Sequence, residues 1–146
     1  MDEIDEKILK ALRKNSRAPY KAIAKKVHIS DVAVHKRIKK LDVGVIKAFT
    51  VLIDQRAYDK DTTALISLRC QVGMTADIAR ALAKIEDVTE VYMALGEYDI
   101  VIKVRTKGTE SLREIVERQL TRIKGIIEIR TSIIYDSVKE DFSLVM

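Results

Sequence analysis

The segment between residues 17 and 41 constrains the fold of this chain more than any other. Apolar residues recur there at helical spacing from Ile23 to Val27. Pro19 precedes them, and its fixed φ and missing N–H suit the first turn of a helix. The pattern predicts a short amphipathic helix that begins near Pro19 and ends before a turn.

A second helix is predicted directly after that turn, which falls at His28 and Ile29. Ser30 is placed to cap this helix, because its hydroxyl can accept hydrogen bonds from the free N–H groups of the first turn. Apolar residues at positions i, i+4 and i+7 form the predicted inward stripe: Val34, Ile38 and Leu41. Two short helices joined by a tight turn are the layout of a helix-turn-helix, in which the first helix braces the second against the DNA major groove.

The solvent side of the second helix is basic. At about 100° per residue, lysines fall on that side, and an exposed Val32 can contact a thymine methyl group. Lysine side chains reach phosphates and guanine edges. The predicted DNA-contacting residues are Ser30, Val32, Ala33, His35, Lys36, Arg37, Lys39 and Lys40. The alternative interpretation is an ordinary solvated basic face.

A preceding amphipathic segment supplies a third helix. Acidic residues crowd the start of the chain, where they suit a helix dipole, and apolar residues line one face from Ile4 to Leu12. Three helices within residues 1–46 make a compact DNA-binding head. A strand is predicted over residues 45–53, followed by a polar hinge. The strand and the hinge form the predicted linker between the head and the next domain, residues 47–61.

The two parts of the chain differ in charge. Residues 1–48 carry 13 lysines and arginines against 6 aspartates and glutamates, a net charge of +7. Residues 49–146 carry 14 against 16, a net charge of −2. The positive excess that suits a polyanion such as double-stranded DNA therefore lies in the head.

The third part of the chain, residues 62–146, alternates strand and helix patterns. Strands are predicted over residues 63–72, 88–95, 98–105 and 126–135, with helices around residues 78–85 and 112–123. This order is that of a ferredoxin-like βαββαβ domain. Residues 82–91 echo residues 120–129 as L-x-(K/R)-I-x-x-(V/I)-x-E-(V/I), as a duplicated half would. The predicted fold class is α+β, with a helix-turn-helix head joined to a ferredoxin-like domain.

One side of the predicted sheet is partly apolar. Leu65, Val101 and Ile134 fall opposite the main core stripe, among polar residues. Such a face favours a second copy of the chain, and a homodimer would let two heads engage two DNA half-sites. The alternative is a monomer with scattered apolar residues on its surface.

Cysteine usage and hydropathy predict a cytoplasmic protein with no membrane partner, and its DNA partner implies that it is nucleoid-associated. Cys70 is the single cysteine, so it cannot form an internal disulfide, and it lies in a predicted buried strand. No signal-peptide pattern and no long apolar run occurs in the sequence.

Several stretches of the chain carry a consistent set of motifs. Residues 4–30 and 34–41 are similar to D-x-x-I-L-x-x-L, R-x-(S/T)-Y-x-x-(I/L)-A and S-x-x-x-V-x-x-R-(I/V)-K-x-L. GEYDIVIKV at residues 96–104 contains a G-x-x-D turn and a strand, and residues 123–140 form a helix-to-strand passage. Together they resemble the leucine-responsive regulatory protein and asparagine-operon activator family, also called feast/famine regulators. The resemblance covers nearly the whole chain.

The resemblance implies a transcription regulator with an amino-acid effector. Family members form dimers that often assemble into octamers, and the effector typically sits between dimers, near the G-x-x-D turn and the last strand. The candidate effector-binding residues are Gly96, Glu97, Tyr98, Asp99, Thr131 and Ser132. No other cofactor and no metal site is implied. The alternative is that Gly96 only closes a hairpin and Asp99 only satisfies turn amides.

Two features depart from the family pattern. The connection from Leu41 to Gly44 is one residue shorter than usual, which alters how the head is carried. Pro19 replaces the usual Ser or Thr cap, which removes a hydrogen bond and preserves the helix start.

Two other functions compete with effector-modulated, sequence-specific regulation. Siroheme decarboxylases share this architecture, but both histidines lie in the head, and no metal spacing or nucleophile–base set occurs in the sequence. A multimer that coats DNA with little sequence preference would use the same lysines, because phosphate contacts need no base code. The ratio of specific to nonspecific affinity separates the last possibility from sequence-specific regulation.

Overall fold

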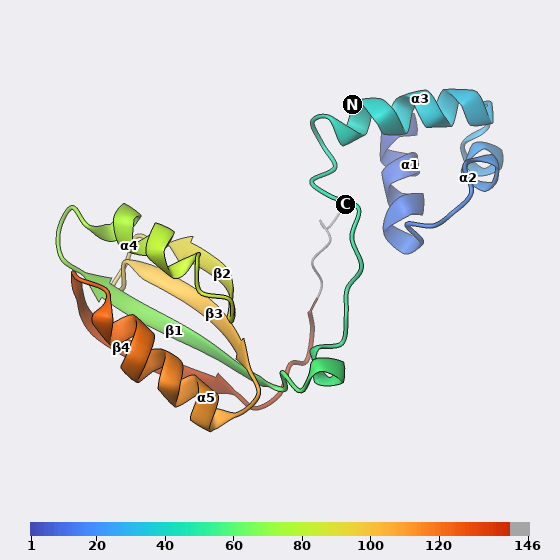
Figure 1. Ribbon diagram of the computed structural model, residues 1–146. Coiled ribbons are helices and arrows are strands. Elements are labelled where there is room, and N and C mark those ends of the chain that lie inside the picture. The colour runs from blue at the N-terminus through green and yellow to red at the C-terminus, as the bar shows by residue number, and fades with distance from the viewer. Residues whose placement is uncertain (141–146) are drawn as a thin grey trace. The chain divides into compact units, whose positions relative to one another are not determined.

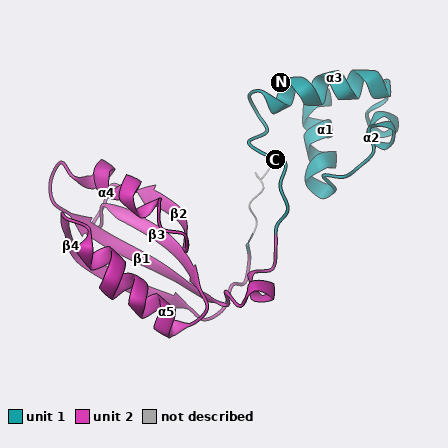
Figure 2. Cartoon of the chain, in the orientation of Figure 1, with its two compact units in different colours: residues 1–52, 140–146 teal, residues 53–139 magenta. Residues whose placement is uncertain are grey.

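In the computed structural model, residues 1–140 are described, and the chain divides into two compact units. Residues 1–52 belong to the first unit and residues 53–139 to the second (Figure 2). None of the helices within residues 1–140 combines the length and the hydropathy of a membrane-spanning segment.

The first unit is a three-helix bundle made of α1 (Glu3–Lys14), α2 (Tyr20–Val27) and α3 (Asp31–Asp42) (Figure 1). Each helix contributes an apolar stripe to a common core. The buried core residues are Ile8, Leu12, Ile23, Ala24, Val27, Val34, Ile38 and Leu41. Both predicted helices of the helix-turn-helix, and the inward stripe of the second, are confirmed.

Local side-chain chemistry sets the helix ends. Asp2 caps α1, because its carboxylate accepts from the Asp5 N–H at 2.9 Å while the Asp5 carboxylate accepts from the Asp2 N–H at 3.1 Å. The Ser30 hydroxyl caps α3 as predicted and accepts from the Ala33 N–H at 3.1 Å. His28 ends α2 in the left-handed conformation with a φ of 58°, which makes the turn tight.

The strand predicted over residues 45–53 is wrong. Residues 46–54 contain no helix or strand, and a short 3-10 turn follows at Gln55–Tyr58. A strand needs a neighbour to receive its backbone hydrogen bonds, and β-branched residues alone do not supply one. Apolar side chains of this segment are exposed: Val45, Phe49, Val51, Leu52 and Ile53.

The second unit is a four-stranded antiparallel sheet with two helices. Its elements follow one another as β1 (Thr62–Cys70), α4 (Thr75–Leu82), β2 (Val88–Met93), β3 (Ile100–Thr106), α5 (Thr109–Glu114) and β4 (Ile126–Ile134). The strands lie in the order β2-β3-β1-β4, and neighbouring strands are antiparallel. The predicted ferredoxin-like order is confirmed.

Both α4 and α5 cover the same face of the sheet (Figure 1). Period-two alternation along the central strands aims one set of side chains at these helices. The buried core residues are Ala64, Ile66, Leu68, Cys70, Ile78, Leu82, Ile100, Ile102, Val104, Leu112, Ile115 and Leu120. Cys70 therefore lies in a buried strand, as the sequence predicted.

The helix predicted around residues 112–123 is present but changes its geometry along its length. α5 continues as a π-helical turn at Ile115–Gln119 and a 3-10 turn at Leu120–Arg122. Gly125 follows with a φ of +96°, and a Cβ there would meet the Met74 sulfur at 2.7 Å. The positive φ and the lack of room for a Cβ both favour glycine at the end of this helix.

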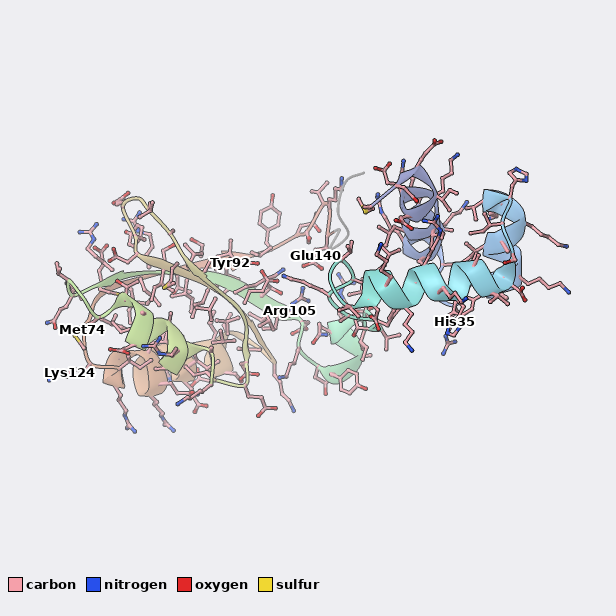
Figure 3. All side chains as sticks on the ribbon, turned by 90° about the horizontal axis from the view of Figure 1, so that it is seen from above. His35, Met74, Tyr92, Arg105, Lys124 and Glu140 are labelled. Carbon is pink, nitrogen blue, oxygen red and sulfur yellow. The ribbon has the colours of Figure 1, made fainter. Side chains whose placement is uncertain are left out.

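The other face of the sheet is open. Leu65 pairs with Ser132 of β4, so both point to this face, where Leu65 is 40% exposed. Val101 and Ile134 share the face and are half-buried. Figure 3 shows Tyr92 on the side of the sheet opposite α4. The predicted mixture of apolar and polar residues on the open face is confirmed.

Candidate DNA-binding surface and effector site

The side of α3 turned away from the buried stripe carries an accessible positive charge. Lys36, Lys39 and Lys40 are exposed, and within residues 1–140 none of them forms an ion pair. Val32 lies on the same side and is 59% exposed. The side chain of His35 points away from α1 (Figure 3). These five predicted DNA-contacting residues are all exposed.

The other predicted DNA-contacting residues form bonds inside the head or lie close to its core. The Arg37 guanidinium donates to the carboxylates of Asp2 and Asp5, at 2.7 Å in both cases. Arg37 therefore braces α3 against the start of α1, and its contact with DNA stays a prediction. Ala33 is half-buried, and its N–H is used by the Ser30 cap. The Ser30 hydroxyl keeps its proton for an external acceptor.

Arg37 also stabilises the charged state of both acids. Its hydrogen bond is the main cause that lowers the pKa of Asp5 below the ordinary value. For Asp2 the largest cause of the lowered pKa is the backbone N–H of Asp5, followed by Arg37. The same two carboxylates raise the pKa of Arg37. The three groups are therefore all charged near neutral pH.

An aromatic pair joins α2 to α3 beside the lysines. The rings of Tyr20 and His35 stack with their centroids 5.5 Å apart and their planes 22° from parallel. Of this pair only His35 was predicted to contact DNA, because a contact between residues in different helices leaves no trace in a periodic pattern.

A shallow hollow of about 500 Å³ lies beside the start of α3. Its lining consists of Lys21, Ala24, Lys25, His28, Ile29 and Asp31. Lys21 and Lys25 come from α2 and were not among the predicted DNA-contacting residues. They add positive charge to this hollow, which Asp31 of α3 also lines.

In the second unit, the loop between β2 and β3 contains the candidate effector residues 96–99. The Asp99 carboxylate accepts from the Cys70 N–H at 2.7 Å, and the Asp99 N–H donates to the Leu68 carbonyl at 2.9 Å. Asp99 thus ties the loop to the end of β1, which is the structural role that the sequence left open. Gly96, unlike Asp99, is not packed against the rest of the domain. No heavy atom outside its chain neighbours lies within 4 Å of the position that a Cβ would take. The backbone at Gly96 is open to an approaching ligand.

Tyr98 lies at the centre of a group of charged side chains. Its hydroxyl donates to Glu128 at 3.0 Å, and the guanidinium groups of Arg69 and Arg130 lie 5.5 Å and 5.3 Å from its ring centroid. Arg69 also pairs with Glu97 at 3.7 Å and with Glu128 at 3.5 Å. Burial and the hydrogen bond to Glu128 raise the pKa of Tyr98, so its hydroxyl stays a donor. The group presents both positive and negative charge beside the loop.

Thr131 and Ser132 do not join this loop within one chain. They pair with Ile66 and Leu65 of β1, so they point to opposite faces of the sheet. In the part of the chain that the structure describes, no hydrogen bond links either side chain to residues 96–99. A single copy therefore does not assemble the six candidate effector residues into one site.

Comparison with known proteins decides the family. Residues 1–42 match the family model of the AsnC-type helix-turn-helix domain. Residues 63–144 match that of the Lrp/AsnC ligand binding domain. The chain belongs to the Lrp/AsnC family. It is a DNA-binding transcription regulator with a ligand-binding domain.

Lrp/AsnC relatives match over nearly their full length. The chain is 37% identical over 145 residues to the HTH-type transcriptional regulator FL11 of Pyrococcus horikoshii, which covers 99% of this chain and 95% of that protein. Its fold is that of Escherichia coli AsnC, with a TM-score of 0.91, 24% identity, and coverage of 97% and 96% of the two chains. A transcriptional regulator of Neisseria meningitidis, solved as a complex with L-Met, gives a TM-score of 0.93 at 22% identity, with 99% and 96% covered. The family and these relatives are transcriptional regulators and not enzymes.

Proposed function

We propose that this Lrp/AsnC regulator reads DNA with the outer face of α3, and that an amino acid bound at the Gly96–Asp99 loop adjusts its assembly. The observation that carries the first half is the set of exposed lysines on one side of α3. Lys36, Lys39 and Lys40 have no ion-pair partner among residues 1–140. Unpaired cations on an exposed helix of a helix-turn-helix suit the phosphates and base edges of double-stranded DNA.

The chemistry around the loop supports the effector. An amino acid presents an ammonium and a carboxylate, and the charged group around Tyr98 contains partners for both. Gly96 leaves room for a ligand to contact the backbone. The match to a ligand-binding domain and the L-Met complex of the Neisseria meningitidis regulator are consistent with this chemistry.

Assembly connects the two halves of the proposal. The open face of the sheet, with Leu65, Val101 and Ile134 on it, suits a second copy of the chain. Dimers would associate further, to an octamer or another multimer, and Thr131 and Ser132 would meet a loop of another copy. An effector between dimers shifts the population of multimers and thereby which half-sites are engaged together. A cytoplasmic location on nucleoid DNA belongs to the same proposal.

Replacing Gly96 by valine tests the effector site without disturbing the fold. The new side chain enters open space, so the free protein should fold and bind DNA as before. It should also block a ligand that contacts the backbone there. We expect one or more of the twenty amino acids to shift the sedimentation profile of the wild-type protein. The Gly96→Val variant should need an effector concentration about tenfold higher, or more, to reach the same shift.

Gly108→Ala is the matched control, because a Cβ at Gly108 also enters open space, at the start of α5. This variant should respond to the effector like the wild type. An unchanged response in Gly96→Val would place the effector elsewhere. If no amino acid changes either sedimentation or DNA binding of the wild type, the effector half of the proposal fails.

A further inference from the structure

The Tyr20–His35 pair occupies a distinct place in the helix-turn-helix. Tyr20 is the first residue of α2, and His35 follows the buried Val34 in α3. At about 100° per residue, His35 falls on one flank of α3 and Arg37 on the other. The contacts confirm this, since Arg37 is bonded to the start of α1 while His35 stacks on α2. One flank of α3 is thus braced by an ion pair and the other by an aromatic stack.

The stack leaves the polar atoms of both rings free. Stacking uses ring faces, and a centroid distance of 5.5 Å with planes 22° apart lies in the range of offset aromatic pairs. Within residues 1–140, neither the Tyr20 hydroxyl nor the ring nitrogens of His35 have a hydrogen-bond partner. Both residues are exposed, Tyr20 by 41%. A ring held by its face and open at its edge suits hydrogen bonding to something outside the protein.

We propose that Tyr20 is a positioning residue that holds His35 for contact with a base edge in the major groove. This rests on the proposal that the outer face of α3 meets DNA. A histidine on an exposed helix samples several rotamers, and stacking on Tyr20 restricts them before DNA arrives. The imidazole edge then meets its base with less conformational entropy left to lose. A neutral imidazole ring has one donor nitrogen and one acceptor nitrogen, so it can form hydrogen bonds with the acceptors and donors on purine edges in the major groove.

The stack itself can be tested in the free protein by nuclear magnetic resonance. The chain has only two histidines, His28 and His35, so a His35→Asn variant identifies the ring signals of His35. Tyr20→Leu should remove the ring-current shift of the His35 ring protons, whereas Tyr20→Phe should keep most of it. Signals of His35 that do not respond to Tyr20→Leu would show that the stack does not form in solution.

The proposed contact between His35 and a base can be tested by selecting the duplexes that the protein binds from a pool of random DNA sequences. We expect His35→Ala and Tyr20→Leu to lose preference at the same base pair of the enriched motif, by about tenfold in relative affinity. Tyr20→Phe should retain that preference, because its ring still stacks. Tyr58→Leu, in the 3-10 turn outside the head, should leave the motif unchanged. If Tyr20→Leu loses helix content, Tyr20→Gln provides a second variant without the ring.

Each other outcome counts against the inference in a different way. A motif that survives His35→Ala would mean that His35 reads no base. A motif that is lost in His35→Ala and intact in Tyr20→Leu would mean that Tyr20 does not position it. If wild-type protein binds the pool strongly and enriches no motif, sequence-specific reading itself fails, and the proposed function fails with it.

Discussion

Replacing Arg37 by alanine is expected to loosen the three-helix head and thereby to abolish tight DNA binding. Its guanidinium donates to Asp2 and Asp5 at 2.7 Å, and Asp5 is buried, with 7% of its surface exposed. Without Arg37 the Asp5 carboxylate keeps only the Asp2 N–H as a donor. A buried charge that loses its partner destabilises the fold around it. Amide hydrogen exchange in α1 and α3 should accelerate by about tenfold or more.

Arg17→Ala is the matched control for this variant. Arg17 is an exposed arginine of the head, and no ion pair links its side chain to another residue between residues 1 and 140. Its loss removes the same charge and should leave amide exchange in α1 and α3 unchanged. Unchanged exchange in Arg37→Ala as well would show that the ion pair does not hold α3.

The helix cap at Asp2 and Asp5 and the ion pair with Arg37 together give the head a pH dependence of known sign. The pKa values of Asp2 and Asp5 are lowered in the folded head, so the unfolded chain binds protons more readily. Their contribution to stability is complete above the ordinary carboxyl pKa, near 3.9, and is lost as the pH falls through the lowered values. A thermal melting series in acid should show this loss in the wild type and a flatter profile in Arg37→Ala.

Removing the lysines of the outer face should have the other large effect. Lys36→Ala combined with Lys39→Ala deletes two exposed cations that have no ion-pair partner in the described part of the chain. Because each phosphate contact releases condensed counterions, DNA affinity at low salt should fall by about tenfold or more. The slope of log affinity against log salt should decrease by about two per head. A titration series from low to moderate salt measures both quantities.

Lys84→Ala combined with Lys124→Ala removes the same charge from the second unit and is the control. This pair should leave both affinity and salt slope close to those of the wild type. Equal losses in the two double variants would mean that overall charge, and not the face of α3, drives DNA binding.

Local patterns predicted most of the fold. The inward stripe of α3 and the cap at Ser30 depend on residues within one or two helical turns, so spacing alone reveals them. The succession of strand and helix patterns along residues 62–146 predicted the ferredoxin-like order. The strand at residues 45–53 failed because pairing depends on a neighbouring strand, which no local pattern specifies.

The candidate sites were less predictable because their contacts join distant residues. Arg37 was predicted to contact DNA because it is a basic residue of the second helix. Its ion pairs with Asp2 and Asp5 join residues 35 and 32 positions apart, which no local pattern reveals. The stack between Tyr20 and His35 depends on how α2 crosses α3. The opposite directions of Thr131 and Ser132, by contrast, follow from simple strand alternation and were available from sequence.

The most direct test of the account is a footprint of the protein on DNA from upstream of its own gene, with excess nonspecific competitor. We expect discrete protected half-sites on one face of the duplex, spaced by whole helical turns, and their loss in the Lys36→Ala, Lys39→Ala double variant. Uniform protection without preferred positions would contradict sequence-specific reading at this DNA and favour a multimer that coats it. No protection even at low salt would contradict the assignment of α3 as the DNA-binding surface.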